Sequence, residues 1–188
     1  MNNFIGEYQM DLELIDDILK YFYENKHLHE EGKVGVDGLK KHVKESTDLG
    51  VKSKNKEYPF NQYRDELQYC LNKYVEQYDI LQETNAFNVN ENYNIQHYPI
   101  GGGFKEWHYE TMMPDHAKRK LVFMTYLNNL DDGGTHFKYY NYTTKAIKGK
   151  TLIWPAAFTH THVGQISYTK EKTIVTGWMG FNEWRISR

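Results

Sequence analysis

The C-terminal half of the chain alternates short apolar runs with turn signals, and this pattern limits its fold more than any other feature. Glycine-containing turns lie at 101–103, 131–134, 149 and 164. Several short strands at such a spacing predict a double-sheet barrel such as a jelly roll. The runs expected to form strands are 92–98, 104–110, 121–127, 135–140, 151–154, 158–163 and 172–179.

Residues 1–85 show helical periodicity instead. The segments 11–24 and 61–82 each repeat apolar residues at helical spacing, and Asp11 stands where it would cap the first helix. Between them, residues 30–57 are rich in Gly and Lys and predict a long polar loop with room for one short strand. A loop of this length is usually functional or mobile, so it is either a solvated face or a lid that meets substrate.

Length and charge favour a single cytoplasmic domain of the α+β class. A chain of 188 residues can bury one core, so we expect one domain, 1–188, with N-terminal helices packed outside a β-core at 86–188. The 23 basic and 25 acidic residues give a net charge of −2, which argues against nucleic acid as the main partner. Cys70 is the only cysteine, which excludes an internal disulfide and a cysteine-based metal site. The sequence has neither the apolar run typical of a signal peptide nor one long enough to predict a membrane span.

Two histidine motifs carry the candidate chemistry. In a Trp-His-Tyr-Glu run, strand alternation would point His108 and Glu110 to the same side. The run 159–162 contains His160 and His162, either of which could add a third ligand. Two histidines and one carboxylate make the facial triad that usually holds non-haem iron(II), and zinc competes for the same ligand types.

A lysine further along the chain adds an anion-binding group. Lys172 follows His162 by ten residues and begins an apolar run that predicts a buried strand. A buried ammonium group is costly unless an anion faces it. A dicarboxylate co-substrate would supply that anion.

From residue 98 to residue 178, the order and spacing of these motifs resemble the prolyl 4-hydroxylase-type branch of the 2-oxoglutarate/iron(II) oxygenases. That branch combines a Tyr and a Gly before an HxD run, a YLN run, a Gly-Gly pair, a distal His, and a basic residue followed by Trp. The run from Trp154 to His162 is also similar to phage-encoded members of the family. The matching residues here are Tyr98, Gly101, His108, Tyr126, Leu127, Asn128, Gly133, Gly134, His162, Lys172 and Trp178.

The resemblance implies a double-stranded β-helix and a set of site residues. His108 and His162 would bind iron(II), and Glu110, where the family usually has Asp, would complete the triad through one oxygen. Lys172 would hold the distal carboxylate of 2-oxoglutarate, and its offset favours His162 over His160. The side chains that would line the 2-oxoglutarate pocket are Tyr98, Tyr126, Thr176 and Trp178.

The implied activity is a hydroxylation coupled to the oxidative decarboxylation of 2-oxoglutarate. Iron(II), 2-oxoglutarate and O2 are the implied cofactor and co-substrates, and ascorbate stays open as an addition. The branch favours a peptidyl prolyl or other amino-acid residue as substrate. The alternatives are a small molecule, sugar or nucleotide substrate, and a catalytically silent, cupin-like binding protein. The compartment would be the cytoplasm, that of the host if the protein is phage-encoded.

The other histidines are expected to be structural or to lie at the surface. Gly101–Gly103 predicts a turn near the cleft rather than a phosphate loop, because no helical pattern follows it. The histidines without an expected metal role are His27, His29, His42, His97, His116 and His136.

Overall fold

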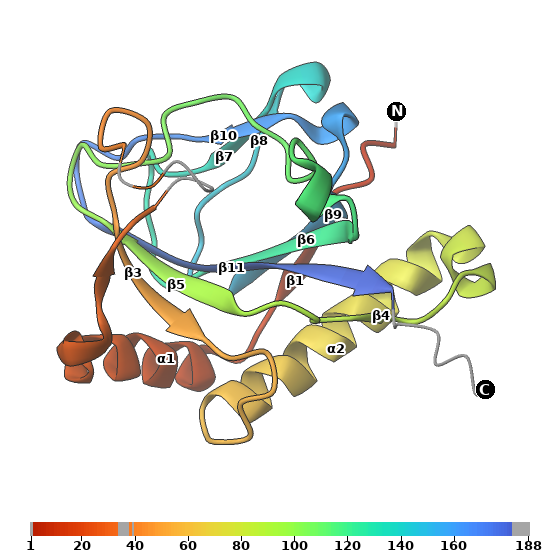
Figure 1. The fold of residues 1–188 in the computed structure, drawn as a ribbon, viewed down its shortest axis with the longest axis horizontal. Coiled ribbons are helices and arrows are strands. Elements are labelled where there is room, and N and C mark those ends of the chain that lie inside the picture. Colours follow the sequence, from red (N-terminus) through yellow and green to blue (C-terminus); the bar gives the residue numbers. More distant parts are fainter. Residues whose placement is uncertain (1, 34–37, 39, 182–188) are drawn as a thin grey trace.

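The computed structural model describes residues 2–33, 38 and 40–181, which form two antiparallel sheets and two α-helices (Figure 1). The larger sheet has eight strands in the order β1-β9-β6-β11-β5-β3-β2, with β4 paired to β11, and the smaller sheet has the order β10-β7-β8. The larger sheet contains β1 (Gly6–Gln9), β2 (Glu30–Glu31), β3 (Thr47–Val51), β4 (Phe87–Asn88), β5 (Tyr93–Tyr98), β6 (Arg119–Tyr126), β9 (Lys150–Pro155) and β11 (Lys172–Phe181). The smaller sheet contains β7 (Thr135–Phe137), β8 (Tyr142–Thr143) and β10 (His162–Gly164).

Both predicted helices are confirmed as α1 (Leu12–Glu24) and α2 (Phe60–Gln77). The Asp11 carboxylate accepts a hydrogen bond from the amide of Leu14 at 2.9 Å, which caps α1 as expected. No helix in the described part of the chain is long and apolar enough to cross a membrane. The short 3-10 helices are η1 (Lys26–Leu28), η3 (Asp79–Glu83), η4 (Pro114–His116), η5 (Lys138–Tyr140) and η6 (Phe158–His160).

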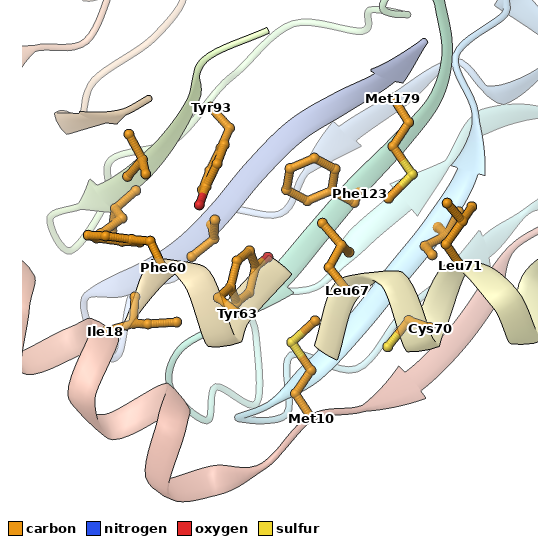
Figure 2. Packing of buried hydrophobic residues seen from close by; sticks show 14 of the residues in the cluster. Met10, Ile18, Phe60, Tyr63, Leu67, Cys70, Leu71, Tyr93, Phe123 and Met179 are labelled. Carbon is orange, nitrogen blue, oxygen red and sulfur yellow. The ribbon is translucent and has the colours of Figure 1, made fainter. Parts of the chain in front are cut away.

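The two helices share a core with one face of the larger sheet, and Figure 2 shows this core from close by. Ile18 of α1 and Tyr63 and Leu67 of α2 are buried in one cluster with Tyr93 of β5 and Phe123 of β6. Burying an apolar side chain of this size contributes roughly 1.5–3 kcal/mol. The helices therefore stabilise one face of the sheet and leave the opposite face for other contacts.

The opposite face carries a second apolar cluster, which includes the smaller sheet. Val122 and Met124 of β6 belong to it, whereas their neighbour Phe123 belongs to the helix-side cluster, as strand alternation requires. Trp154 of β9 packs edge-to-face on Phe137 of β7, with ring centroids 5.4 Å apart. The space between the two sheets is thus lined by alternate residues of the larger sheet.

The polar segment 30–57 is only partly the loop that was predicted. It supplies β2 and β3 to the larger sheet, and β3 pairs with β5 over all five of its residues. Leu49 and Val51 of β3 are buried in the helix-side core, while Asp48 faces the other way. The alternation of Leu49 and Val51 is short and lies among lysines, so the two-residue period of a strand was not recognised in the sequence.

The run 104–110 is not a strand, which corrects the prediction. Lys44–Phe104 and His108–His162 are isolated bridges, and no longer pairing extends from them within the described residues. The amide of Glu110 donates to the carbonyl of Ala156 at 3.1 Å, so the chain turns away instead of continuing beside β10. The runs 135–140 and 158–163 are only partly strand, because η5 and η6 occupy half of each. The predicted strands at 92–98, 121–127, 151–154 and 172–179 are confirmed as β5, β6, β9 and β11.

Candidate metal centre

Three side chains converge on one point. The ligand atoms of His108, Glu110 and His162 all lie within 4.8 Å of one another. Oε1 of Glu110 is 3.4 Å from Nε2 of His162 and 3.7 Å from Nε2 of His108. Two ligands at right angles, each about 2.1 Å from an ion, would be about 3 Å apart. The observed spacing therefore needs only a small contraction to enclose a metal ion.

Backbone carbonyls fix the orientation of both imidazole rings. Nδ1 of His108 lies 2.9 Å from the carbonyl of Glu106, and Nδ1 of His162 lies 2.8 Å from the carbonyl of His160. A carbonyl oxygen only accepts, so each Nδ1 donates a proton. Nε2 of each ring is left facing the shared centre, available as a metal ligand.

A backbone bridge and a turn bring the three residues together. His108 and His162 exchange hydrogen bonds, with N–O distances of 3.1 and 2.9 Å. Glu110 follows in a turn that is anchored at Ala156, so it reaches the centre without the strand alternation that the sequence suggested. The predicted proximity of His108 and Glu110 is observed, but its structural cause is different.

His160 points away from the centre. It is buried at the end of η6, and its Nε2 donates to the carbonyl of Asn3 at 3.0 Å. The prediction of one strand over 158–163, which would put His160 and His162 on the same face, is wrong here, because His160 belongs to η6 and β10 begins only at His162. His136, on β7, hydrogen-bonds the Thr143 hydroxyl at 2.7 Å and is not part of the cluster.

Burial and mutual proximity favour the protonation states that bind a metal. Burial, reinforced by the neighbouring His162, lowers the pKa of His108 to about 4. Burial alone would raise the pKa of Glu110, but the neighbouring imidazoles of His162 and His108 lower it to about 2. At neutral pH, His108 is therefore a neutral imidazole and Glu110 a carboxylate.

A cavity of about 530 Å³ opens over these ligands. Strand β11 forms one wall, and its register aligns Lys172 with Tyr98 of β5 and Ile174 with Tyr126 of β6. Every residue predicted to line a 2-oxoglutarate pocket lies on the wall of this cavity: Tyr98, Tyr126, Lys172, Thr176 and Trp178.

Lys172 is a buried cation with room for an anion. Its side chain is 4% exposed, and its Nζ donates to the carbonyl of Gln165 at 2.6 Å. Nζ also lies 5.2 Å from the centre of the Tyr98 ring. Burial lowers the pKa of Lys172 to about 8, because neither of these contacts supplies a full negative charge.

The other predicted pocket residues have distinct partners. The Tyr126 hydroxyl lies 2.8 and 2.9 Å from the hydroxyls of Thr135 and Thr144. The Tyr98 hydroxyl donates to Gln96, and that of Thr176 donates to a backbone carbonyl of β6. Trp178 differs from the rest, because its indole Nε1 donates to Oε2 of Glu110 at 2.7 Å.

Sequence reasoning missed several polar residues on the cavity wall. Arg119 lies beside Glu110, with Nη1 3.9 Å from Oε2. Lys44 and Asp48, on the polar segment, form an ion pair at 2.5 Å and are 5% and 13% exposed. The signal for Asp48 was its place directly before the alternation of Leu49 and Val51. Nothing in the sequence around Arg119 pointed to the site.

Two amide side chains also face the cavity. Asn94 and Gln96 alternate along β5 with residues of the helix-side core. The register places Asn94 between Gly50 of β3 and Thr176 of β11, so the three form one row across the sheet. Their signal was the period-two pattern of the run 92–98, which marks one face as polar.

Comparisons with known proteins agree with this geometry. Residues 93–180 match the 2OG-Fe(II) oxygenase superfamily. No curated protein sequence matches the chain. Among solved structures, a Pseudomonas putida prolyl-4-hydroxylase is similar with a TM-score of 0.70 and 13% identity, over 95% of this chain and 93% of that one.

Two further structures have the same fold. The viral collagen prolyl hydroxylase of Paramecium Bursaria Chlorella virus-1, in complex with 2OG, has a TM-score of 0.69 and 15% identity, over 95% of this chain and 97% of that one. A Trichoplax adhaerens prolyl hydroxylase, in complex with a hypoxia inducible factor peptide fragment, has a TM-score of 0.69 and 12% identity, over 94% and 84% of the two chains. At such identities these likenesses establish the fold.

The superfamily match spans the whole candidate site, from Tyr98 to Trp178. The superfamily uses iron(II), 2-oxoglutarate and O2, and the cluster of His108, Glu110 and His162 suits that metal. Residues 93–180, which contain the candidate site, thus form a 2OG-Fe(II) oxygenase domain, and the protein is a 2-oxoglutarate-dependent dioxygenase.

Proposed function

We propose that His108, Glu110 and His162 bind iron(II) in a site that hydroxylates an amino-acid residue of a peptide. The convergence of the three ligand atoms within 4.8 Å, at the base of a 530 Å³ cavity, carries this proposal. Two imidazoles and one carboxylate leave coordination positions open for other ligands. When bound, iron(II) with 2-oxoglutarate and O2 supplies the oxidation that yields succinate, CO2 and a hydroxylated product.

We assign the distal carboxylate of 2-oxoglutarate to Lys172. Its ammonium group is buried at one end of the cavity, and a carboxylate there would replace the carbonyl of Gln165 as its main partner. Tyr98 and Tyr126 lie on β5 and β6, the two strands that flank β11, and their hydroxyls can turn to donate to the same group. A zinc hydrolase would use the same triad, but it has no need of this buried cation and its two phenols.

The protein's own residues orient the reactants and exclude water. The carbonyls of Glu106 and His160 hold the two imidazoles in one tautomer, and Thr135 and Thr144 hold the Tyr126 hydroxyl. Thr176, whose hydroxyl is bonded to the backbone of β6, forms a neutral wall. The buried setting strengthens each of these contacts relative to water.

A peptidyl prolyl or other amino-acid residue is the substrate we favour. The three similar structures are prolyl hydroxylases, and one of them holds a peptide fragment. The amides of Asn94 and Gln96 on the cavity wall suit the polar groups of a peptide backbone. A small molecule, a sugar or a nucleotide is the alternative substrate. A catalytically silent binding protein would not require Lys172 and the triad together.

We also infer that the polar segment meets the substrate. Glu30, Glu31, Lys33, Lys44 and Asp48 all lie on the cavity wall, far along the chain from the metal ligands. Residues 34–37 and 39, which belong to the predicted lid, lie outside the described residues. These side chains, held on the wall by β2 and β3, would help to shield a bound substrate from water.

The finer fold and setting are proposals of the same kind. We infer that the larger and smaller sheets together form a double-stranded β-helix, with α1 and α2 outside it. We further infer that residues 1–188 fold as one domain and act in the cytoplasm.

The test is succinate production with iron(II), 2-oxoglutarate, O2 and a peptide library, with mass spectrometry to find peptides that gain one oxygen atom. His162→Ala is the matched inactive control. Peptide-dependent succinate and a hydroxylated peptide are expected from the wild-type protein alone. Succinate that rises with sugars or nucleotides but never with peptides would replace the peptide assignment. If the wild-type protein bound neither Mn(II) nor 2-oxoglutarate, the proposed active site would be refuted.

A further inference from the structure

The two oxygens of the Glu110 carboxylate have different partners. Oε1 faces the Nε2 atoms of His108 and His162, at 3.7 and 3.4 Å. Oε2 accepts a hydrogen bond from Nε1 of Trp178 at 2.7 Å. The Glu110 side chain is only 13% exposed, so protein groups rather than water hold both oxygens. Glutamate has one more torsion than the aspartate usual in this family, and this restraint therefore matters more here.

Arg119 lies against the indole that makes this bond. Its guanidinium carbon is 3.4 Å from the centre of the Trp178 ring, and its side chain is 9% exposed. A cation stacked on a Trp face is attractive, and it limits rotation of the indole. Nε1 of Trp178 consequently stays directed at Glu110.

A β-bulge turns Arg119 toward the cavity. On β6, odd-numbered residues from Leu121 onward face the helices and even-numbered ones face the other side. Strict alternation would send Lys120 to the cavity and Arg119 to the helices. The pairing with β11 shifts between Met179 and Gly180, so that Gly180 is opposite Arg119. Lys120 is thereby left exposed, and Arg119 lies on the cavity wall.

Glu91 occupies the outer edge of the guanidinium group. Its carboxylate accepts hydrogen bonds from Nε of Arg119 at 3.0 and 3.2 Å and from Nη2 at 2.7 Å. This leaves Nη1 as the nitrogen nearest to Glu110. Without Glu91, the same edge would be free to form a paired ion bridge with Glu110 and compete with a metal for its carboxylate.

We propose that Trp178, Arg119 and Glu91 are positioning residues that make Glu110 a one-oxygen metal ligand. The inference rests on the proposed metal site and extends it, because it states which oxygen binds and what selects it. Holding Oε2 on the indole removes the two-oxygen binding mode that a long glutamate side chain permits. One more coordination position then stays open for 2-oxoglutarate and O2.

Metal binding without turnover tests the proposal. Co(II) is titrated anaerobically, and its visible absorption reports both affinity and coordination number. Trp178→Phe keeps a ring beside Arg119 but removes the N–H; we expect Co(II) affinity to fall about 10- to 100-fold, with a changed spectrum. Tyr69→Phe is the control, since Tyr69 is an exposed aromatic residue on α2, outside the cavity wall. Its Co(II) spectrum should stay that of the wild type.

A double-mutant cycle separates positioning from packing. In a Glu110→Asp background, whose shorter side chain ends farther from the indole, Trp178→Phe should cause a smaller loss of Co(II) affinity than in the wild type. Glu91→Gln, at a side chain that is 42% exposed, serves if Trp178→Phe does not fold, and a several-fold loss is expected. Unchanged Co(II) affinity and spectra in both Trp178→Phe and Glu91→Gln would overturn the proposal. Wild-type protein that binds Co(II) no better than His162→Ala would instead overturn the metal site itself.

Discussion

The side chain of Lys172 tests the 2-oxoglutarate site independently of the metal. Lys172→Ala removes one partner of the expected buried charge pair, which costs about 2–5 kcal/mol, or roughly 30- to several-thousand-fold in 2-oxoglutarate affinity. Lys172→Arg should recover part of the loss, because the charge remains while its shape changes. Isothermal titration with Mn(II) present measures both. Lys170→Ala, at an exposed lysine nearby, is the control; equal affinities in Lys172→Ala and Lys170→Ala would assign the carboxylate to another residue.

The lowered pKa of Lys172 predicts that the affinity for 2-oxoglutarate depends on pH. Burial lowers the pKa of Lys172 to about 8 in the ligand-free protein, so its ammonium form is intact below that pH and is lost above it. A dicarboxylate needs the charged form; 2-oxoglutarate affinity should thus be level below pH 8 and fall about tenfold per pH unit above it. In Lys172→Arg the profile should stay flat, since guanidinium does not titrate in this range. A flat profile in the wild type would contradict the assignment.

Substitution of His160 and of His162 should have different effects. His162→Ala should abolish Mn(II) binding, because it removes one of three ligands. His160→Ala should leave Mn(II) affinity close to wild type but lower the free energy of unfolding by about 1–3 kcal/mol, since the carbonyl of Asn3 loses its buried partner. Metal titration and urea unfolding measure the two effects. The reverse pattern would move the metal to His160.

At the scale of elements, α2 should contribute to stability but not to chemistry. Leu67 is buried on the helix side of the larger sheet, opposite the cavity. Leu67→Ala should cost about 2–5 kcal/mol in urea unfolding. The folded fraction should bind Mn(II) and 2-oxoglutarate as the wild type does. A large loss of ligand affinity in the folded variant would mean that the two faces of the sheet are coupled.

Elements with an uninterrupted period were predictable from the sequence. The apolar spacing of 11–24 and the β-branched run at 172–179 identify α1 and β11, because each buries a regular face. The run 104–110 was wrongly predicted to be a strand. It pairs through single bridges to distant segments, and the pattern of residues within the run does not reveal this. The three residues of the candidate metal cluster could be named because His108 and Glu110 form a short local motif and His162 precedes Lys172 by ten residues. Arg119 could not, because a bulge set by the partner strand decides its direction.

At the scale of the whole molecule, Mn(II) and 2-oxoglutarate should each raise the thermal stability of the protein. A ligand that binds only the folded state adds RT ln(1 + [L]/Kd), or about 2.7 kcal/mol at a hundredfold excess over Kd. Melting with Mn(II), with and without 2-oxoglutarate, should give a further rise in Tm from 2-oxoglutarate. Lys172→Ala should keep the rise in Tm caused by Mn(II) and lose the further rise caused by 2-oxoglutarate. No shift from 2-oxoglutarate with any metal would contradict the co-substrate assignment.

The pairing of β1 with β9 has a consequence for how the chain matures. Gly6–Gln9 lies beside Lys150–Pro155, and the core that α1 and α2 share depends on β5, β6 and β11. A nascent chain that ends before β11 can bury neither the helices nor the central strands, so we expect folding to wait until β11 has left the ribosome. His108 and Glu110 leave the ribosome well before His162, and they meet it only through the backbone bridge of the finished fold. Metal loading at the proposed site is therefore expected only after β11 has been made.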